Sequence, residues 1–304
     1  MVDLSIIIVS YNTKDVTEKC LLTLKDTIRK QNKSTTFEII VVDNASEDQT
    51  EEMLQKVQEV FRKTKISLKT LLNSRNLGYA KANNQGAALA EGRYLLFLNS
   101  DVIVGDINFS EILSFMDGNT DVGVLTVRLD LLDGGIDPAS HRGFPTLWRS
   151  FCYFFGLERL FGKIPIINRV FGGYHLTYTD LNKTHEIDSP TGAFYLIRKG
   201  LFTEVGRFNE SFFMYGEDLD LSYRIKQLGK RIIYFPKYRV IHLKYQSGLR
   251  SKDDTTQKET RKHFYDAMRI FYDKHYAKKK PQFVNALVYF LITKMENAHE
   301  KNRN

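Results

Sequence analysis

The N-terminal third of the chain alternates between short apolar runs and longer amphipathic or alanine-rich segments. The apolar runs are Ser5–Ser10, Phe37–Asp43, Ser67–Leu72 and Tyr94–Asn99. The segments between and after them are residues 14–28, 46–61 and 79–91. Short β-branched runs are typical of buried parallel strands, and apolar side chains four residues apart indicate helices. This alternation predicts an α/β fold with a Rossmann-like, mostly parallel central sheet flanked by helices.

The later part of the chain is less regular. We expect strands at 193–198 and 231–235, a helix at 217–228 and turns at 133–142. Ser46 and Gln49 have the spacing of a capping box, which predicts that the second helix begins there. Beyond Gly248 the sequence is charged and helical in pattern. The chain is therefore expected to form one domain over 1–248, followed by a basic helical C-terminal tail over 249–304.

Composition and charge narrow the class of protein. The 304 residues include only two cysteines, far apart, which argues against a disulfide framework or a structural zinc site. The start of the chain has no signal-peptide pattern, and no apolar run reaches the roughly 20 residues that span a bilayer. The net charge is +8, and residues 250–304 hold thirteen Lys/Arg against seven Asp/Glu. Because no nucleic-acid-binding motif accompanies this charge, we expect no nucleic-acid partner, and phosphate-bearing molecules or an anionic membrane explain it better.

Polar residues follow all four N-terminal strands. They are Ser10, Tyr11 and Asn12 after the first, Asp43 and Asn44 after the second, Arg75, Asn76 and Gly78 after the third, and Asn99, Ser100 and Asp101 after the fourth. Ligands of parallel sheets bind beyond the carboxyl ends of the strands, so these residues predict a binding site. Neither GxGxxG nor a P-loop is present, so a nucleotide would be held by side chains and turn amides. Asp43 suits a pyrimidine imide N–H or a ribose hydroxyl; the alternative is that it only forms a turn.

Acidic residues at two places are candidates for chemistry. Asp101 follows a buried strand, and Mg²⁺ or Mn²⁺ commonly binds one or two carboxylates together with substrate phosphates. Glu217 and Asp218 follow Gly216 and open a predicted helix. In both cases the alternative is a capping role. His242 follows an apolar run, and a lone histidine is more often structural than a ligand.

Several stretches together resemble the inverting glycosyltransferases of family 2, which have the GT-A fold, and in particular their rhamnosyltransferase-like branch. They are VSYN (9–12), VVDNASEDQT (41–50), NSRNLGYAKANNQG (73–86), LLFLNSDV (95–102), TGAFYLIRK (191–199), GRFNESFFMYGEDLDLSYR (206–224) and HLKYQSG (242–248). The resemblance covers roughly residues 3–248. It implies a nucleotide-binding half over about 1–105 and an acceptor half over 106–248.

The resemblance also implies roles for individual residues. Asp218 matches the general base, with Glu217 supporting it or contacting the acceptor. Asp101 matches the last residue of the metal-binding DxD motif, with His242 as a second ligand of Mg²⁺ or Mn²⁺. The first Asp of that motif is Asn99 here, which leaves the usual ribose contact in doubt. The nucleotide-sugar site would comprise Ser10, Tyr11, Asn12, Asp43, Asn44, Arg75, Asn76, Gly78, Asn83, Asn99, Ser100 and Gly192.

The implied reaction is transfer, with inversion, of a sugar from a dTDP- or UDP-sugar, L-rhamnose in the branch it resembles most. The acceptor would be a hydroxyl of a glycan or of a lipid-linked acceptor in surface polysaccharide synthesis. A non-catalytic sugar-nucleotide-binding protein and a sugar-nucleotide pyrophosphorylase are the alternatives. The first would lack the carboxylates, and the second would have a Gly-rich, basic N-terminal loop.

Two segments bear on where such an enzyme works. Residues 144–176 are aromatic and basic, and residues 278–294 place a ten-residue apolar stretch between lysines. Both suit a membrane interface rather than a span. We therefore expect a cytoplasmic enzyme, peripheral at the inner face of the plasma membrane. The alternative is that the tail packs on the core or on a second subunit, as a homodimer.

Overall fold

The computed structural model describes residues 2–31, 34–244 and 254–301. Within them, nine strands form a single sheet in the order β3-β2-β1-β4-β8-β6-β9-β5, with β7 paired to β9. The strands are β1 (Leu4–Ser10), β2 (Phe37–Asp43), β3 (Ser67–Leu72), β4 (Tyr94–Asn99), β5 (Val102–Val104), β6 (Val122–Asp130), β7 (His185–Ile187), β8 (Phe194–Arg198) and β9 (Arg231–His242). Strands β3, β2, β1 and β4 are parallel, β8 runs antiparallel to both its neighbours, and β6 and β9 are parallel to each other.

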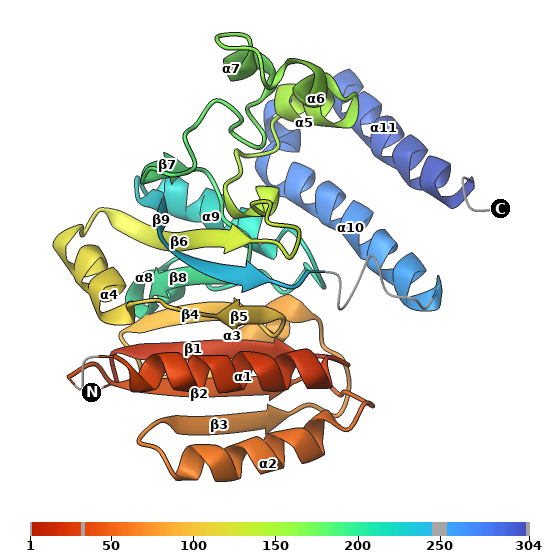
Figure 1. Cartoon of the computed structure of the whole chain (residues 1–304). Helices are drawn as coiled ribbons and strands as arrows, with labels where there is room; N and C mark the ends of the chain where they lie inside the picture. Colours follow the sequence, from red (N-terminus) through yellow and green to blue (C-terminus); the bar gives the residue numbers. More distant parts are fainter. Residues whose placement is uncertain (1, 32–33, 245–253, 302–304) are drawn as a thin grey trace.

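Helices cover both faces of this sheet (Figure 1). They are α1 (Lys14–Arg29), α2 (Thr50–Arg62), α3 (Tyr79–Leu89), α4 (Phe109–Gly118), α5 (Leu147–Phe154), α6 (Leu157–Phe161), α7 (Asn168–Phe171), α8 (Lys199–Glu204), α9 (Glu217–Gln227), α10 (Asp254–His275) and α11 (Gln282–Lys301). Two short 3₁₀ turns, Pro138–Ser140 and Ala277–Lys279, complete the elements.

The two faces of the sheet explain why β1 and β2 are mostly apolar and buried along their whole length. Alternate residues of each strand point to opposite faces, and both faces are covered. Ile6 and Ile8 pack in one core cluster with α1, α2 and α4, whereas Ile7 and Val9 pack in a second cluster with α3, α8 and α9. All seven residues of β1 are buried, including its two serines, and Ser5 donates to the buried Glu38 of β2 over 2.5 Å.

The start of α2 differs from the expected capping box. The helix begins at Thr50, after Gln49 in the left-handed region at φ 65°. Ser46 caps nothing: its hydroxyl donates to Asp43 Oδ1 over 2.6 Å and accepts the N–H of Asn12 over 2.9 Å. The capping-box prediction was therefore wrong, because Ser46 is held by the loops after β1 and β2 rather than by its own helix.

The C-terminal helices lie at the end of the molecule far from β3 and α2 (Figure 1). Helix α10 packs on α9, where Phe212 and Leu219 form a small core with Ala267 and Phe271. Helices α5, α6 and α7 lie at the same end (Figure 1). The proposed boundary at Gly248 lies outside the described residues.

Candidate active site

The carboxyl ends of β1, β2 and β4 lie level with one another. Ser10 pairs with Asp43, and Val9 pairs with Asn99, so the loops after these strands open at one edge of the sheet. A cleft of about 1420 Å³ lies at this edge. Twelve of the predicted site residues line it: Tyr11, Asn12, Asn44, Asn76, Gly78, Asn99, Ser100, Asp101, Gly192, Glu217, Asp218 and His242.

Four predicted site residues do not line the cleft. Ser10 is buried and hydrogen-bonds to Thr17 of α1. Arg75 is exposed and lies outside the cleft. Asp43 is buried, and both of its carboxylate oxygens accept hydrogen bonds from Ser46. These bonds form a turn, which was the alternative expected for Asp43. Asn83 donates to the carbonyl of Tyr79 one helical turn earlier and supports α3 from inside. These side chains shape the loops, and a direct contact with a nucleotide stays a prediction.

The loop after β3 is held by amides rather than by a glycine-rich phosphate loop. Asn44 donates to Asn76 Oδ1 over 2.7 Å and accepts the N–H of Leu77 over 3.1 Å. Gly78 follows at φ +85°, where an added Cβ would lie 2.6 Å from the carbonyl oxygen of Phe213. Any side chain at Gly78 would therefore push this loop away from the turn that precedes α9.

Asp101 and His242 meet because their strands are paired. Val102 of β5 lies opposite His242 of β9, which brings the His242 Nε2 atom to 3.3 Å from Asp101 Oδ1. The other ring nitrogen contacts Asp137 Oδ2 at 2.8 Å, and Asp137 also pairs with Lys244 at 2.7 Å. Burial alone would lower the pKa of His242, but the bonds to Asp101 and Asp137 outweigh it and raise the pKa to about 9.

This arrangement fits two ligands of a divalent cation. Asp137 orients the His242 ring through Nδ1 and leaves Nε2 facing Asp101. Histidines that bind metals commonly have their other ring nitrogen held by a carboxylate in this way. Among the described residues no three His, Cys, Asp or Glu side chains gather as a complete metal site. The remaining ligands would have to come from a bound diphosphate and water, as is usual for Mg²⁺.

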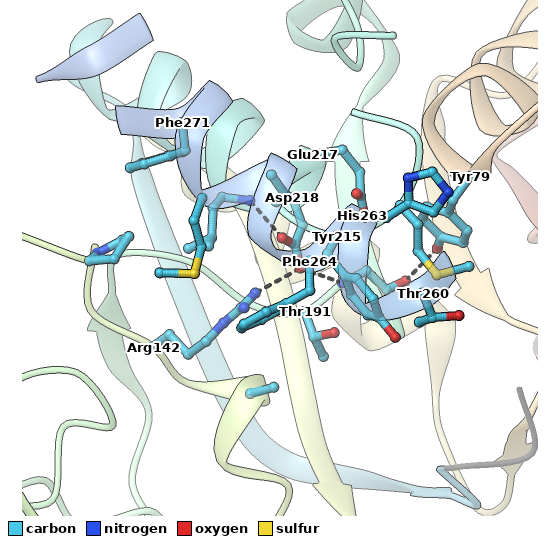
Figure 2. Close-up of a pocket in the computed structure, with 18 of the residues that line it drawn as sticks. Tyr79, Arg142, Thr191, Tyr215, Glu217, Asp218, Thr260, His263, Phe264 and Phe271 are labelled. Carbon is cyan, nitrogen blue, oxygen red and sulfur yellow. Dashed lines mark hydrogen bonds and ion pairs between the residues drawn. The ribbon is translucent and has the colours of Figure 1, made fainter. Parts of the chain in front are cut away.

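Asp218 lies at the start of α9 and is held by three donors (Figure 2). Its Oδ2 accepts from Arg142 over 2.7 Å and from the Gly192 N–H over 3.1 Å, and its Oδ1 accepts from the Leu219 N–H over 2.7 Å. Arg142 is anchored in turn on the carbonyl of Pro190. The carboxyl group therefore has a fixed orientation at the wall of the cleft, and Oδ1, which accepts a single bond, keeps a lone pair for a further donor.

Glu217 differs from its neighbour in its surroundings. It is buried, and its Oε2 has no hydrogen-bond partner among the described residues. Burial and the adjacent Asp218 charge raise the pKa of Glu217 well above its usual range. Of the two acids, Asp218 is thus the one whose orientation is fixed by donors to both of its oxygens.

Sequence reasoning missed several residues of this cleft. Asp137 and Arg142 lie in the segment expected to form only turns, where no periodicity marks them. Tyr79 opens α3, and its hydroxyl donates to Asn99 Oδ1 over 2.9 Å. Helix α10 was assigned to a separate tail, yet His263 and Phe264 line the cleft beside Asp218 (Figure 2). The one signal for these two residues in the sequence is that an acidic and a basic side chain occur within the same turn-rich segment.

The mixed sheet and the polar cleft at its edge define the GT-A class of α/β protein. The family described as "Glycosyl transferase family 2" matches residues 5–180, more than half of the chain, and the chain belongs to this family. The O-antigen biosynthesis protein RfbC of Myxococcus xanthus is 27% identical over 77% of the chain. The N-acetylglucosaminyl-diphospho-decaprenol L-rhamnosyltransferase of Mycobacterium tuberculosis is 27% identical over 69% of the chain and 67% of its own length.

Solved structures agree on the fold. Staphylococcus aureus TarS 1-349 in complex with UDP-GlcNAc superposes with a TM-score of 0.55 at 21% identity, over 87% of this chain and 65% of that one. GalNAc-T7 with UDP, GalNAc and Mn²⁺ gives a TM-score of 0.58 at 17% identity, over 80% and 44%. The chain spans less than a quarter of the first curated relatives it matches, 17% in the case of RfbC.

Proposed function

We propose that this protein is an inverting, metal-dependent glycosyltransferase that uses a dTDP- or UDP-sugar, with dTDP-L-rhamnose as the first candidate donor. Its acceptor would be a hydroxyl of a glycan or lipid-linked acceptor in surface polysaccharide synthesis. One observation carries the proposal. A carboxylate fixed by three donors, Asp218, lines the same cleft as the Asp101–His242 pair and the polar loops after β1, β2 and β4.

The reaction needs a base and stabilisation of the leaving group. Asp218 would accept the proton of the acceptor hydroxyl as its oxygen bonds to the anomeric carbon, on the face opposite the breaking bond to the diphosphate. General-base catalysis typically contributes about 10²–10⁴-fold. Asp101 and His242 would hold a divalent cation, which when bound neutralises charge on the departing nucleoside diphosphate. Arg142 holds Asp218 in a fixed orientation, and Glu217, buried with one oxygen unpartnered among the described residues, would support it or contact the acceptor.

The proposed nucleotide-sugar donor is supported by similar proteins and by the loop that follows β2. UDP and UDP-GlcNAc occur in the solved relatives, and the rhamnosyltransferase of M. tuberculosis is among the sequence relatives. Asp43 lies at the end of β2, beside the cleft-lining Asn44, where it would accept the N–H of a pyrimidine base. The bonds from Ser46 engage one lone pair on each Asp43 oxygen and leave acceptor capacity for that contact.

The proposal also places the enzyme at a membrane. No helix in the described part of the chain is long and apolar enough to cross a bilayer. Large apolar side chains are nevertheless exposed on α5–α7 and on α11, including Phe155, Ile166, Phe283 and Phe290. These helices lie at one end of the molecule (Figure 1). We infer that this end rests on the cytoplasmic face of the plasma membrane, as a peripheral contact.

The test is turnover of nucleotide sugars by the full chain. With Mn²⁺, slow hydrolysis of dTDP- or UDP-sugars should occur without acceptor and accelerate when a suitable acceptor is added. A pyrophosphorylase would instead need pyrophosphate or a sugar phosphate, and a non-catalytic binder would bind the donor without hydrolysing it. Binding of GDP tighter than that of dTDP or UDP, measured by calorimetry, would contradict the pyrimidine assignment.

A further inference from the structure

The cleft extends well beyond the residues that we propose take part in the sugar transfer. Sites for drug-sized ligands usually enclose about 300–1,000 Å³, and the volume here is about 1420 Å³. The additional part of its wall comes from α5, α10 and α11. Its apolar lining includes Phe151 and Phe154 of α5, Met268 and Phe271 of α10, and Leu287 and Leu291 of α11.

We propose that this extension, the apolar groove between α5, α10 and α11, binds the hydrocarbon chain of a lipid-linked acceptor. The inference rests on the proposed function, because it assigns the acceptor of that same site. A glycan acceptor without lipid would need hydroxyl and amide partners along the groove, and the side chains that line it from these three helices are mostly apolar.

The two ends of the groove favour a lipid chain over a purely soluble molecule. One end opens beside Asp218, Arg142 and Thr191, where the sugar of the acceptor would react (Figure 2). The other is bordered by α5 and α11, the helices whose apolar side chains are exposed at the end of the molecule. A chain in the groove would therefore lead from the base to the proposed membrane face along a mostly apolar lining.

Charge around the groove suits an anionic linker next to the chain. Lys278–Lys280 precede α11 and Lys294 lies within it, all of them exposed, and Lys294 also lines the groove. Basic groups next to an apolar groove match a lipid that carries phosphate or diphosphate, since each positive charge near an anionic head group adds attraction. The occupant is thus a hydrocarbon chain attached to an anionic head group.

The first test measures binding without turnover. Calorimetry with Mg²⁺ compares farnesyl diphosphate with dimethylallyl diphosphate, which share the head group and differ in chain length. We expect farnesyl diphosphate to bind at least about tenfold more tightly, because added methylene groups leave water. Equal affinities for the two compounds would overturn the proposal whatever the enzyme's activity.

A matched pair of variants on α11 locates the chain. Leu287 and Phe290 are both exposed, at 55% and 62%, but only Leu287 is among the residues that line the groove. Leu287→Gln should weaken farnesyl diphosphate by about tenfold and leave dimethylallyl diphosphate unchanged, whereas Phe290→Gln should leave both unchanged. Met268→Gln, on α10, should act as Leu287→Gln does. Chain-length dependence that survives in Leu287→Gln and Met268→Gln would overturn the assignment.

Two further readouts separate this inference from its alternatives. Hydrolysis of the donor sugar tests the proposed function: if it is absent while chain-dependent binding persists, the transferase proposal fails and the groove stands. Sedimentation tests a second copy as the occupant. If Leu287→Gln converts a dimer to a monomer without changing the affinity for farnesyl diphosphate, the groove is a subunit interface and the proposal is overturned.

Discussion

At the scale of single residues, the site depends on two carboxylates in different surroundings. Asp218 accepts from Arg142 and from two backbone N–H groups, whereas Glu217 next to it is buried with one oxygen unpartnered among the described residues. The donors fix the orientation of the Asp218 side chain, whereas burial disfavours the ionised form of Glu217. Glu217 and Asp218, which are adjacent at the start of α9, are thereby suited to different roles.

The Asp218→Asn variant should keep its fold and its affinity for the donor. Transfer to the acceptor should fall by at least about 100-fold, because an amide cannot take the proton. Steady-state kinetics and calorimetry with the nucleoside diphosphate measure the two quantities. Glu217→Gln is the matched control and should retain more activity than Asp218→Asn. Transfer within a few-fold of the unmodified enzyme in Asp218→Asn would remove this residue from the base role.

Asp101 provides the corresponding test of metal dependence. EDTA should abolish activity and Mg²⁺ or Mn²⁺ should restore it, since the diphosphate charge has to be neutralised as it leaves. Asp101→Ala should weaken nucleoside diphosphate binding at least about tenfold in the presence of metal and have little effect in its absence. Calorimetry with and without Mn²⁺ measures the difference. Full activity in chelator would disprove the metal requirement.

At the scale of secondary structure, the elements around the parallel half of the sheet follow from the sequence. The apolar runs of β1 and β2 and the four-residue spacing of α1 reflect local burial, and their bounds agree with the expected ones to within one residue. Strand β5, the three short helices α5–α7 and the continuation of β9 to His242 were not expected. They are fixed by pairing and packing with distant parts of the chain, for which a local pattern carries no signal.

The candidate site shows the same division. Residues at strand ends, such as Asn99 and Asp101, could be placed together because parallel strands end at one edge. Asp137 could not, since its place beside His242 depends on the register between β6 and β9 and on the turn after β6. Asp43 was rightly placed at that edge, but its side chain bonds to Ser46, a contact that depends on the left-handed Ala45 between them.

Helix α10 is tied to α9, which carries Asp218, through one buried acid. Asp220 is fully buried and pairs with Arg224 of α9 and with Lys274 and His275 of α10. Burial would raise its pKa, but the bond to His275, the charge of Arg224 and the bonds to Lys274 and Arg224 together lower it to about 2. The lowered pKa means that Asp220 stabilises the fold when ionised, and that this contribution is lost on protonation.

Asp220→Asn should therefore reduce the free energy of unfolding by about 2 kcal/mol near neutral pH. The depressed pKa makes this contribution full above about pH 4 and lost as the pH falls towards 2, so the two proteins should converge in acid. Urea unfolding at a series of pH values measures the difference. Asp121→Asn, which removes an exposed ion pair with Arg231, is the control and should leave stability almost unchanged. A constant difference across the pH range would contradict the linkage.

At the scale of the whole molecule, the polar cleft and the exposed apolar side chains lie towards the same end. The N-terminal part of the sheet, with β3 and α2, occupies the opposite end (Figure 1). Helices α5–α7 and α11 expose aromatic and aliphatic side chains, with Ile166 83% and Phe283 74% accessible. A soluble monomer rarely exposes large contiguous apolar patches, so this end is expected to contact another surface. Its lysines favour an anionic membrane as that surface.

Co-sedimentation of the full chain with vesicles tests the membrane contact. The protein should pellet with vesicles that contain anionic lipid at low salt, and less so at high salt, because screening weakens the attraction of its lysines. A Phe283→Ser/Phe290→Ser double variant should lower the partition coefficient at least about tenfold, since each phenylalanine that leaves the interface forfeits roughly 1.5–3 kcal/mol. Leu132→Ser is the matched control: Leu132 is 70% exposed but lies after β6, outside α5–α7 and α11, and its loss should leave partitioning unchanged. If the unmodified protein stays in the supernatant with anionic vesicles at low salt, the apolar end does not bind membrane, and a protein interface takes its place.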